Sequence, residues 1–182
     1  MFASALLLLL VAGTPEEEMG AMPTTSKAPA FHVTAGLRSG VLIRPPSADP
    51  TLSFHGALRG GTFEPLVLMG VTIAPGKTLT VWEVPLAIGF RIPIVFSAWS
   101  LVPEILAGAR MHFYTASELD SGGVGADLTG MLGLSLLREI GPFKLGLRVG
   151  LDLATPREHV LGDQVLWTRG PVGFSVQLHI ER

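Results

Sequence analysis

The fold is decided by the stretch WEVPLAIGFRIPI, residues Trp82–Ile94. Apolar residues occupy every second position, and they are Trp82, Val84, Leu86, Ile88, Phe90 and Ile92. The positions between them include Glu83, Ala87, Gly89 and Arg91. A period of two predicts a β-strand whose two faces meet different surroundings. The alternation is longer than the roughly 5–6 residues of an average globular strand. It is long enough for the about 9–11 residues of a strand that crosses a membrane.

The same alternation recurs along the rest of the chain. A helical reading is disfavoured because Lys144, Arg148 and Asp152 share one parity, which breaks any stripe of 3.6-residue period. We therefore predict eight strands, over residues 31–44, 51–61, 65–73, 78–93, 101–114, 124–137, 143–154 and 171–181.

The composition favours a barrel in a membrane. Only 15% of the residues are charged, against about 25% in soluble domains, and the mean hydropathy is +0.48. No apolar run of about 18 residues follows the N-terminal segment, which argues against helical membrane spans. The net charge of −2 offers no basic surface for nucleic acid. Cysteine is absent, which excludes disulfides, thiolate metal sites and a cysteine nucleophile.

Two features indicate which face of the strands points outward. The apolar parity is nearly free of charge, as contact with lipid requires. The polar parity is rich in glycine, and the interior of an eight-stranded barrel is narrow enough to need small residues. We predict an all-β protein, a closed eight-stranded antiparallel up-and-down transmembrane β-barrel. The alternative is a soluble periplasmic, lipocalin-like barrel that binds a ligand and points its apolar face inward.

The chain divides into three parts. Residues 1–13 contain an apolar run and small residues at a cleavage position, which predicts a signal peptide. Residues 14–30 are rich in Glu, Pro, Thr and Ser and predict a flexible segment, and residues 31–182 form the barrel. Short turns are typical of the periplasmic side and long loops of the outer side. The long connection 155–170 is therefore expected outside the cell, and both termini in the periplasm.

Three stretches carry a resemblance: WEVPLAIGFRIPI, LVPEILAGARMHFY at residues 101–114 and GPVGFSVQLHIER at residues 170–182. Together they resemble the small outer-membrane β-barrel families, similar in plan to the OmpA-barrel and opacity-protein group. The resemblance implies a bacterial outer-membrane location, with membrane lipid, lipopolysaccharide and the barrel-assembly machinery as partners. Gly173, Val176 and Leu178 fit the spacing of a closing strand that this machinery reads. The chain departs from the pattern by ending in Glu181–Arg182 instead of an aromatic residue.

The polar parity carries charges of both signs, and charges inside a barrel must pair to offset their desolvation. The turn positions place Arg91 opposite Glu104, Glu83 opposite His112, and His112 opposite Asp127. We predict an ion-pair network in the lumen formed by Glu83, Arg91, Glu104, Arg110, His112, Asp127, Arg148 and Asp152. Such a network would plug the barrel; the alternative is a narrow polar pore or a proton-responsive gate.

No enzyme, cofactor or metal site is predicted. Ser175 and His179 lie four residues apart on one strand, roughly 13 Å at about 3.4 Å per residue, too far for a nucleophile–base pair. The rival class is a small outer-membrane barrel that remodels lipids with such a pair. His32 and His179 are expected at neighbouring strand ends near Glu181, but this loose set does not supply tight zinc coordination.

The expected function is a structural or surface-interaction role in the outer membrane. The outer loops, chiefly residues 155–170, would contact lipopolysaccharide or another cell-surface partner. A minor channel or transport accessory is the alternative function.

Overall fold

The computed structural model describes residues 32–45, 47–75, 79–116, 121–161 and 164–182. The predicted signal peptide and flexible segment, residues 1–30, lie outside this part of the chain. The strands are β1 His32–Arg44, β2 Ser47–Arg59, β3 Glu64–Ala74, β4 Leu79–Arg91, β5 Ile94–Phe96, β6 Trp99–Ala116, β7 Ser121–Ile140, β8 Phe143–Ala154, β9 Arg157–Leu161, β10 Gln164–Arg169 and β11 Val172–Glu181. No helix among the described residues is long and apolar enough to cross a membrane.

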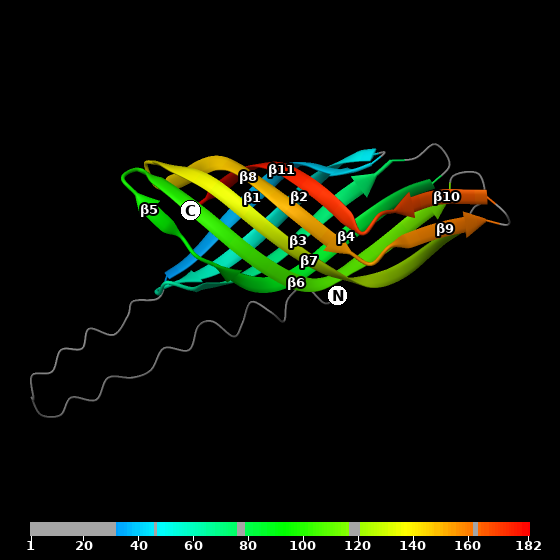
Figure 1. Ribbon diagram of the computed structural model, residues 1–182, viewed down its shortest axis with the longest axis horizontal. Coiled ribbons are helices and arrows are strands. Elements are labelled where there is room, and N and C mark those ends of the chain that lie inside the picture. The colour runs from blue at the N-terminus through cyan, green and yellow to red at the C-terminus, as the bar shows by residue number, and fades with distance from the viewer. Residues whose placement is uncertain (1–31, 46, 76–78, 117–120, 162–163) are drawn as a thin grey trace, which may run out of the picture.

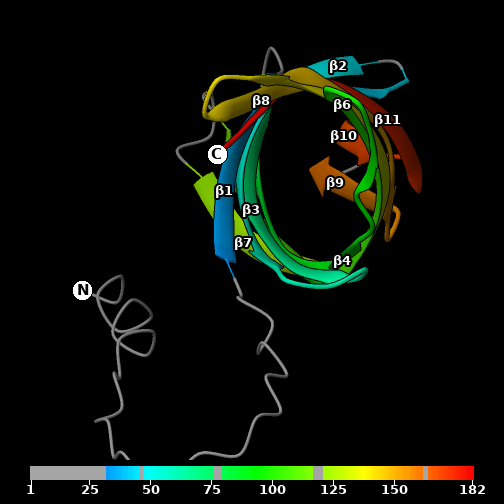
Figure 2. The ribbon, with the colours of Figure 1, turned by 90° about the vertical axis from the view of Figure 1, so that its left-hand side faces the viewer.

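Eight of the strands close into an antiparallel barrel (Figures 1 and 2). The order around it is β4-β3-β2-β1-β11-β8-β7-β6, and pairing of β4 with β6 closes the ring. Strands β9 and β10 form a separate hairpin at one end, which we call the hairpin end. The start of β1 and the end of β11 meet at the opposite, terminal end, where Ala35 exchanges two backbone hydrogen bonds with Arg182.

All eight predicted strands are present, which confirms the fold class, and β8 has the predicted bounds. β2 begins at Ser47 instead of residue 51, because Arg44 pairs directly with Ser47 in a tight hairpin. β6 and β7 extend beyond the alternating segments that predicted them, and their long pairing continues as far as Ala116 and Ser121. The connection 155–170, predicted as a loop, contains the β9–β10 hairpin, whose strands are too short for a clear periodic pattern.

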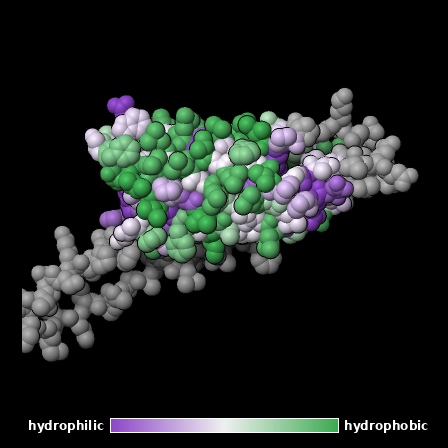
Figure 3. Space-filling view, in the orientation of Figure 1, coloured by the Kyte–Doolittle hydropathy of each residue, from purple (hydrophilic) through white to green (hydrophobic). Residues whose placement is uncertain are grey.

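The apolar parity forms the outer wall of the barrel. Exposed fractions are 50% for Leu86, 57% for Ile105, 59% for Leu147 and 45% for Val176. On the face drawn in Figure 3, hydrophobic residues cover most of the wall, and hydrophilic residues are found mainly towards the two ends of the barrel. The polar parity points inward and is buried. The alternative barrel with an apolar interior and a polar wall is therefore wrong.

The lumen also contains an apolar patch that the polar parity did not suggest. Its members come from the neighbouring strands β2, β3, β4, β6 and β7. They are Ala57, Leu66, Leu68, Ala87, Leu106 and Met131. β3 is apolar on both parities, so its inward face supplies leucines where other strands supply charges. The patch fills part of the cross-section and so leaves the buried charges to meet one another in the remaining space.

Candidate functional site

Most of the charged side chains in the lumen form three clusters along the barrel, and most members of these clusters are buried. The hairpin-end cluster contains Arg44, Asp49, Glu83, Arg110, His112, Asp127, Asp152, Arg157 and Arg169. The middle cluster contains Arg38, Glu104 and Arg148, with Ser175 and Gln177 beside them. The terminal-end cluster contains Thr34, His55, Arg59, Glu64, Arg91, His179 and Glu181.

Glu83 is the centre of the hairpin-end cluster. Its Oε1 accepts hydrogen bonds from Arg44 and Arg169, each at 2.9 Å, and its Oε2 accepts one from Arg110 at 3.3 Å. Arg110 continues the network by donating to Asp152 on β8. A buried carboxylate with three guanidinium partners has its desolvation well compensated, and hydrogen bonds between charged groups are the strongest class in proteins.

Asp127 joins the hairpin to the same cluster. Its two oxygens accept from Arg157 and Arg169, and one of them also contacts His112 Nε2. Arg169 is fully buried although it belongs to β10, and it also donates to the Thr155 carbonyl at 2.7 Å. The β9–β10 hairpin is therefore held against the end of the lumen by charged contacts that reach inward.

The middle cluster is built around one carboxylate that pairs with two guanidiniums. Arg38 donates to both oxygens of Glu104, at 2.9 and 2.7 Å, and Arg148 donates to Oε1 at 2.8 Å. Glu104 on β6 and Arg148 on β8 meet across β7 because Gly133 lies between them. A Cβ at Gly133 would stand 2.5 Å from Arg148 Nη2 and 2.7 Å from Glu104 Oε1. The absence of a side chain at this point makes the contact between alternate strands feasible.

The terminal-end cluster is held together by Arg91. This guanidinium donates to Glu64 at 2.7 Å, to Thr34 at 2.9 Å and to both oxygens of Glu181. Glu181 Oε2 also lies 3.3 Å from Nε2 of His55, which in turn lies 3.3 Å from Nε2 of His179. Two fully buried imidazoles therefore converge on one carboxylate near the end of the barrel.

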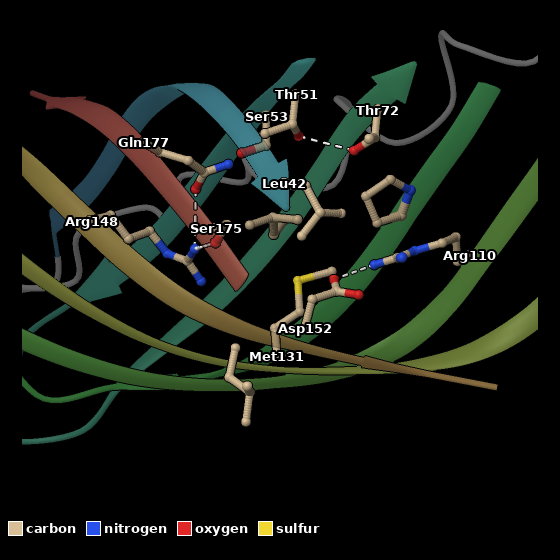
Figure 4. Close-up of a pocket in the computed structure, with 13 residues that line it drawn as sticks. Leu42, Thr51, Ser53, Thr72, Arg110, Met131, Arg148, Asp152, Ser175 and Gln177 are labelled. Atoms are coloured by element: carbon tan, nitrogen blue, oxygen red, sulfur yellow. Dashed lines mark hydrogen bonds and ion pairs between the residues drawn. The ribbon is translucent and has the colours of Figure 1, made fainter. Parts of the chain in front are cut away.

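A small pocket lies between the middle and hairpin-end clusters (Figure 4). Arg148 borders it on one side, where it donates to Ser175 and Gln177 at 3.0 and 3.1 Å. Arg110 and Asp152 border it on the other side. Figure 4 shows both guanidiniums already turned towards protein acceptors. This pocket offers no unpaired charged group for an ionic ligand among the side chains that line it.

The structure places the predicted site residues in all three clusters. Glu83, Arg110, His112, Asp127 and Asp152 belong to the hairpin-end cluster, Glu104 and Arg148 to the middle cluster, and Arg91 to the terminal-end cluster.

Two of the predicted cross-strand pairs have the expected register, Arg91 with Glu104 and Glu83 with His112. Arg91 and Glu104 nevertheless form their ion pairs with other partners.

The third predicted register is wrong. Asp127 pairs with Arg110 and His112 pairs with Gly125, because the β6–β7 connection is centred one position earlier than expected. The His112 and Asp127 side chains still touch, reaching diagonally across the two strands. The predicted neighbourhood of His32 and His179 is also wrong: His32 pairs with Arg59 and is exposed, whereas His179 pairs with Arg38.

Sequence reasoning missed several members of the clusters. Arg169 lies in a connection predicted as a loop, and Glu64 lies at the margin of its strand. The alternation of apolar and polar positions therefore did not predict that either side chain points inward. Arg44 and His55 do have the inward parity. Their neighbours were not predicted, because β2 was expected to begin at residue 51 and begins at Ser47. The charged or titratable cluster members absent from the predicted network are Arg38, Arg44, Asp49, His55, Arg59, Glu64, Arg157, Arg169, His179 and Glu181.

A serine–histidine contact does occur, between residues that the sequence did not pair. Ser135 Oγ lies 3.0 Å from His179 Nδ1, while Ser175 bonds to Arg148 instead. Ser135 and His179 are both fully buried inside the lumen. A nucleophile must reach its substrate as well as its base, and this hydroxyl faces the lumen and not the outer wall of the barrel.

The comparisons with solved structures give the fold a context. Neisserial surface protein A matches with a TM-score of 0.55 at 8% identity, over 83% of this chain and 95% of that one. A major outer membrane protein of Thermus thermophilus matches with a TM-score of 0.58 at 11% identity, over 84% and 98%.

The fold is that of small outer-membrane β-barrels. Ail of Yersinia pestis, solved in complex with the heparin analogue sucrose octasulfate, matches with a TM-score of 0.50 at 9% identity, over 83% of this chain and 95% of that one. No protein-family model matches the sequence, and no curated protein does.

Proposed function

We propose that the protein is an integral β-barrel of a bacterial outer membrane, with a structural or surface-interaction role and a lumen plugged by its ion-pair clusters. The main observation behind this proposal is that the barrel combines an apolar outer wall with a charged interior. Leu86, Ile105 and Leu147 are exposed on the wall, while Arg38, Glu83 and Arg110 are almost completely buried. In water this arrangement would expose the apolar surface that folding normally buries, whereas acyl chains would cover it.

The plug is supported by the way the three clusters divide the lumen. Each cluster joins side chains from several strands, and the apolar patch fills a further part of the lumen. Continuous passage of an ion would require breaking buried pairs, and removing the partner of a buried charge costs about 3–5 kcal/mol. A channel role would need a conformation in which these pairs are open. We therefore favour a closed barrel over the alternative of a conducting one.

The long connection between β8 and β11 supports an orientation for the barrel. Long loops of such barrels face the outside and short turns face the periplasm, so the hairpin end would face the cell exterior. Both ends of the barrel domain would then lie in the periplasm, where the closing strand β11 is available to the assembly machinery. The β9–β10 hairpin would be the surface that meets lipopolysaccharide or another surface partner.

Fractionation and gel mobility test the membrane assignment. We expect the protein in the outer-membrane fraction, resistant to extraction at alkaline pH, and migrating differently before and after boiling because a folded barrel stays compact in detergent. Recovery as a soluble periplasmic protein would contradict the proposal.

A hairpin replacement tests the surface role. A short Gly/Ser linker replacing residues 158–168 keeps Arg157 and Arg169, which hold the lumen end together. We expect this variant to fold but to lose co-purifying lipopolysaccharide. Replacing residues 60–63, at the other end of the barrel, is the matched control and should leave lipopolysaccharide bound. Equal retention by both variants would rule out the hairpin as the contact surface.

A further inference from the structure

We propose that His55, His179 and Glu181 form a binding site for one late first-row divalent metal ion, with zinc as the best match. The three side chains come from β2 and β11, and all are buried in the lumen near the terminal end. They are the one group of three or more potential metal ligands that converge among the described residues. The proposal needs the barrel geometry alone and is independent of the surface role.

The distances between the three ligand atoms fit a tetrahedral metal. His55 Nε2 lies 3.3 Å from His179 Nε2 and 3.3 Å from Glu181 Oε2, and the remaining edge is 3.8 Å. Zinc binds imidazole nitrogen at about 2.0–2.1 Å and carboxylate oxygen at about 2.0–2.2 Å, so tetrahedral geometry separates two such ligands by about 3.3–3.5 Å. The same three atoms therefore already outline one face of a coordination tetrahedron.

The backbone makes room for this convergence at Gly36. This residue pairs with His55 on one side and with Glu181 on the other, so β1 lies between the two ligands. A Cβ at Gly36 would stand 2.1 Å from His55 Cε1 and 2.6 Å from His55 Nε2. The missing side chain lets the imidazole lie over β1 and reach the carboxylate. The site thus depends on the row formed by His55, Gly36 and Glu181, which lie opposite one another on β2, β1 and β11.

The surroundings hold one histidine and the carboxylate of the site in place, since Ser135 contacts His179 and Arg91 donates to Glu181. His179 Nδ1 lies 3.0 Å from Ser135 Oγ, a contact compatible with an N–H on Nδ1 and a free lone pair on Nε2, which is the arrangement that outer-shell partners give to histidine ligands at metal sites. Two buried carboxylates, Glu64 and Glu181, share one buried guanidinium, Arg91. Arg59 also reaches Glu64, at 3.5 Å, but its side chain is 38% exposed. Arg38 of the middle cluster is engaged by Glu104.

Without metal, one N–H on His55 Nε2 can serve both acceptors, His179 Nε2 and Glu181 Oε2. With metal, the ion takes the place of that proton, and the imidazole proton of His55 resides on Nδ1. Two histidines and one carboxylate leave a fourth position for water, the pattern of zinc sites with an open coordination place. Glu181 also lines a pocket at the terminal end with Thr34, Lys144 and Arg182, which provides a route for the ion.

The test measures zinc bound by the folded, detergent-purified protein. The protein is stripped with a chelator, equilibrated with Zn²⁺ and passed through a desalting column before metal analysis. We expect one zinc per chain, and Co²⁺ at the same site should give the strong visible absorption of four- or five-coordinate cobalt, displaced by Zn²⁺. Failure of the wild-type protein to retain zinc would overturn the proposal, whatever the behaviour of the variants.

Substitutions assign the ligands. His55→Asn and His179→Asn should each weaken zinc binding by at least 10–100-fold, since losing even an outer-shell partner costs about that much. His112→Asn is the matched control, because His112 is equally buried and ion-paired but lies in the hairpin-end cluster. It should still retain one zinc. Retention by both His55→Asn and His179→Asn, or loss from His112→Asn alone, would overturn the assignment. Should a variant not fold, as shown by gel mobility, the wild-type stoichiometry and cobalt spectrum decide.

Discussion

Arg169 on the β9–β10 hairpin donates to Oε1 of Glu83 on the barrel strand β4 at 2.9 Å, and both side chains are fully buried in the lumen. The same guanidinium also contacts Asp127 and the Thr155 carbonyl. A segment outside the eight-stranded ring therefore supplies a charge that the interior of the ring needs. With this contact the hairpin would be part of the proposed plug as well as of the proposed contact surface.

Arg169→Ala should loosen the hairpin and open the hairpin end of the lumen. Glu83 keeps Arg44 and Arg110 as partners, so we expect a folded barrel. In planar bilayers the variant should show brief conducting events that the wild-type protein lacks. Arg157→Ala is the control, because this side chain also binds Asp127 but is 30% exposed. Indistinguishable traces from Arg169→Ala and wild type would show that the deeper clusters close the lumen without it.

Glu104→Gln should destabilise the barrel by about 3–5 kcal/mol, the typical cost of removing one partner of buried ion pairs. Arg38 and Arg148 would then face each other in the middle cluster without a carboxylate. Urea unfolding in lipid vesicles, followed by tryptophan fluorescence, measures the free energy of unfolding. Glu139→Gln, at an exposed position of β7, serves as the control and should change it by less than about 0.5 kcal/mol. Equal losses in the two variants would contradict the role of the cluster.

Most of the strands were predictable from sequence because apolar and polar residues alternate in them almost without exception, and β3, which is apolar on both parities, is the exception. In β8, for example, the alternation from Phe143 to Ala154 fixes both the strand and its two faces. The inward location of Glu83, Arg110 and Arg148 follows from the same parity. Local pattern is sufficient here because a closed barrel gives every strand one apolar and one polar environment.

Partners within the lumen could not be predicted, because they depend on register and on reach across several strands. A β2 start at residue 51 would centre the first hairpin so that Arg59 stands opposite Gly36, whereas the observed Arg44–Ser47 pair places His55 there. Contacts such as Glu104 with Arg148 skip an entire strand over Gly133. Pairwise reasoning on adjacent strands does not detect contacts of this kind.

Gly146→Ala should destabilise the barrel by about 1–3 kcal/mol through overpacking. A Cβ at this position would stand 1.8 Å from the Leu136 carbonyl oxygen, so the backbones of β7 and β8 would have to move apart. Gly130→Ala is the control, because its nearest neighbours would lie 3.9 Å away. Equilibrium unfolding of the two variants in the same vesicles makes the comparison. A Gly130→Ala loss as large as that of Gly146→Ala would contradict the close approach.

Val149→Arg and Val33→Arg test whether lipid surrounds the wall, because the free-energy cost of a lipid-facing arginine depends on its depth in the membrane. Val149 is exposed near the middle of β8, where an arginine facing acyl chains costs about 2–4 kcal/mol. Val33→Arg, exposed near the start of β1 at the terminal end, should cost about 0–1 kcal/mol, as expected near the membrane interface. Both values come from unfolding in vesicles. Equal costs at the two positions would argue that lipid does not surround the wall.

The most direct test places spin labels on two adjacent residues of β11. The chain contains no cysteine, so Ser175→Cys and Val176→Cys each give one label, on the lumen side and on the wall respectively. In phospholipid vesicles, oxygen should relax the label at position 176 strongly while a water-soluble nickel complex does not, and the label at position 175 should be poorly accessible to oxygen. Strong relaxation of the position-176 label by the nickel complex, with oxygen reaching position 175 instead, would contradict an apolar wall in lipid around a charged lumen.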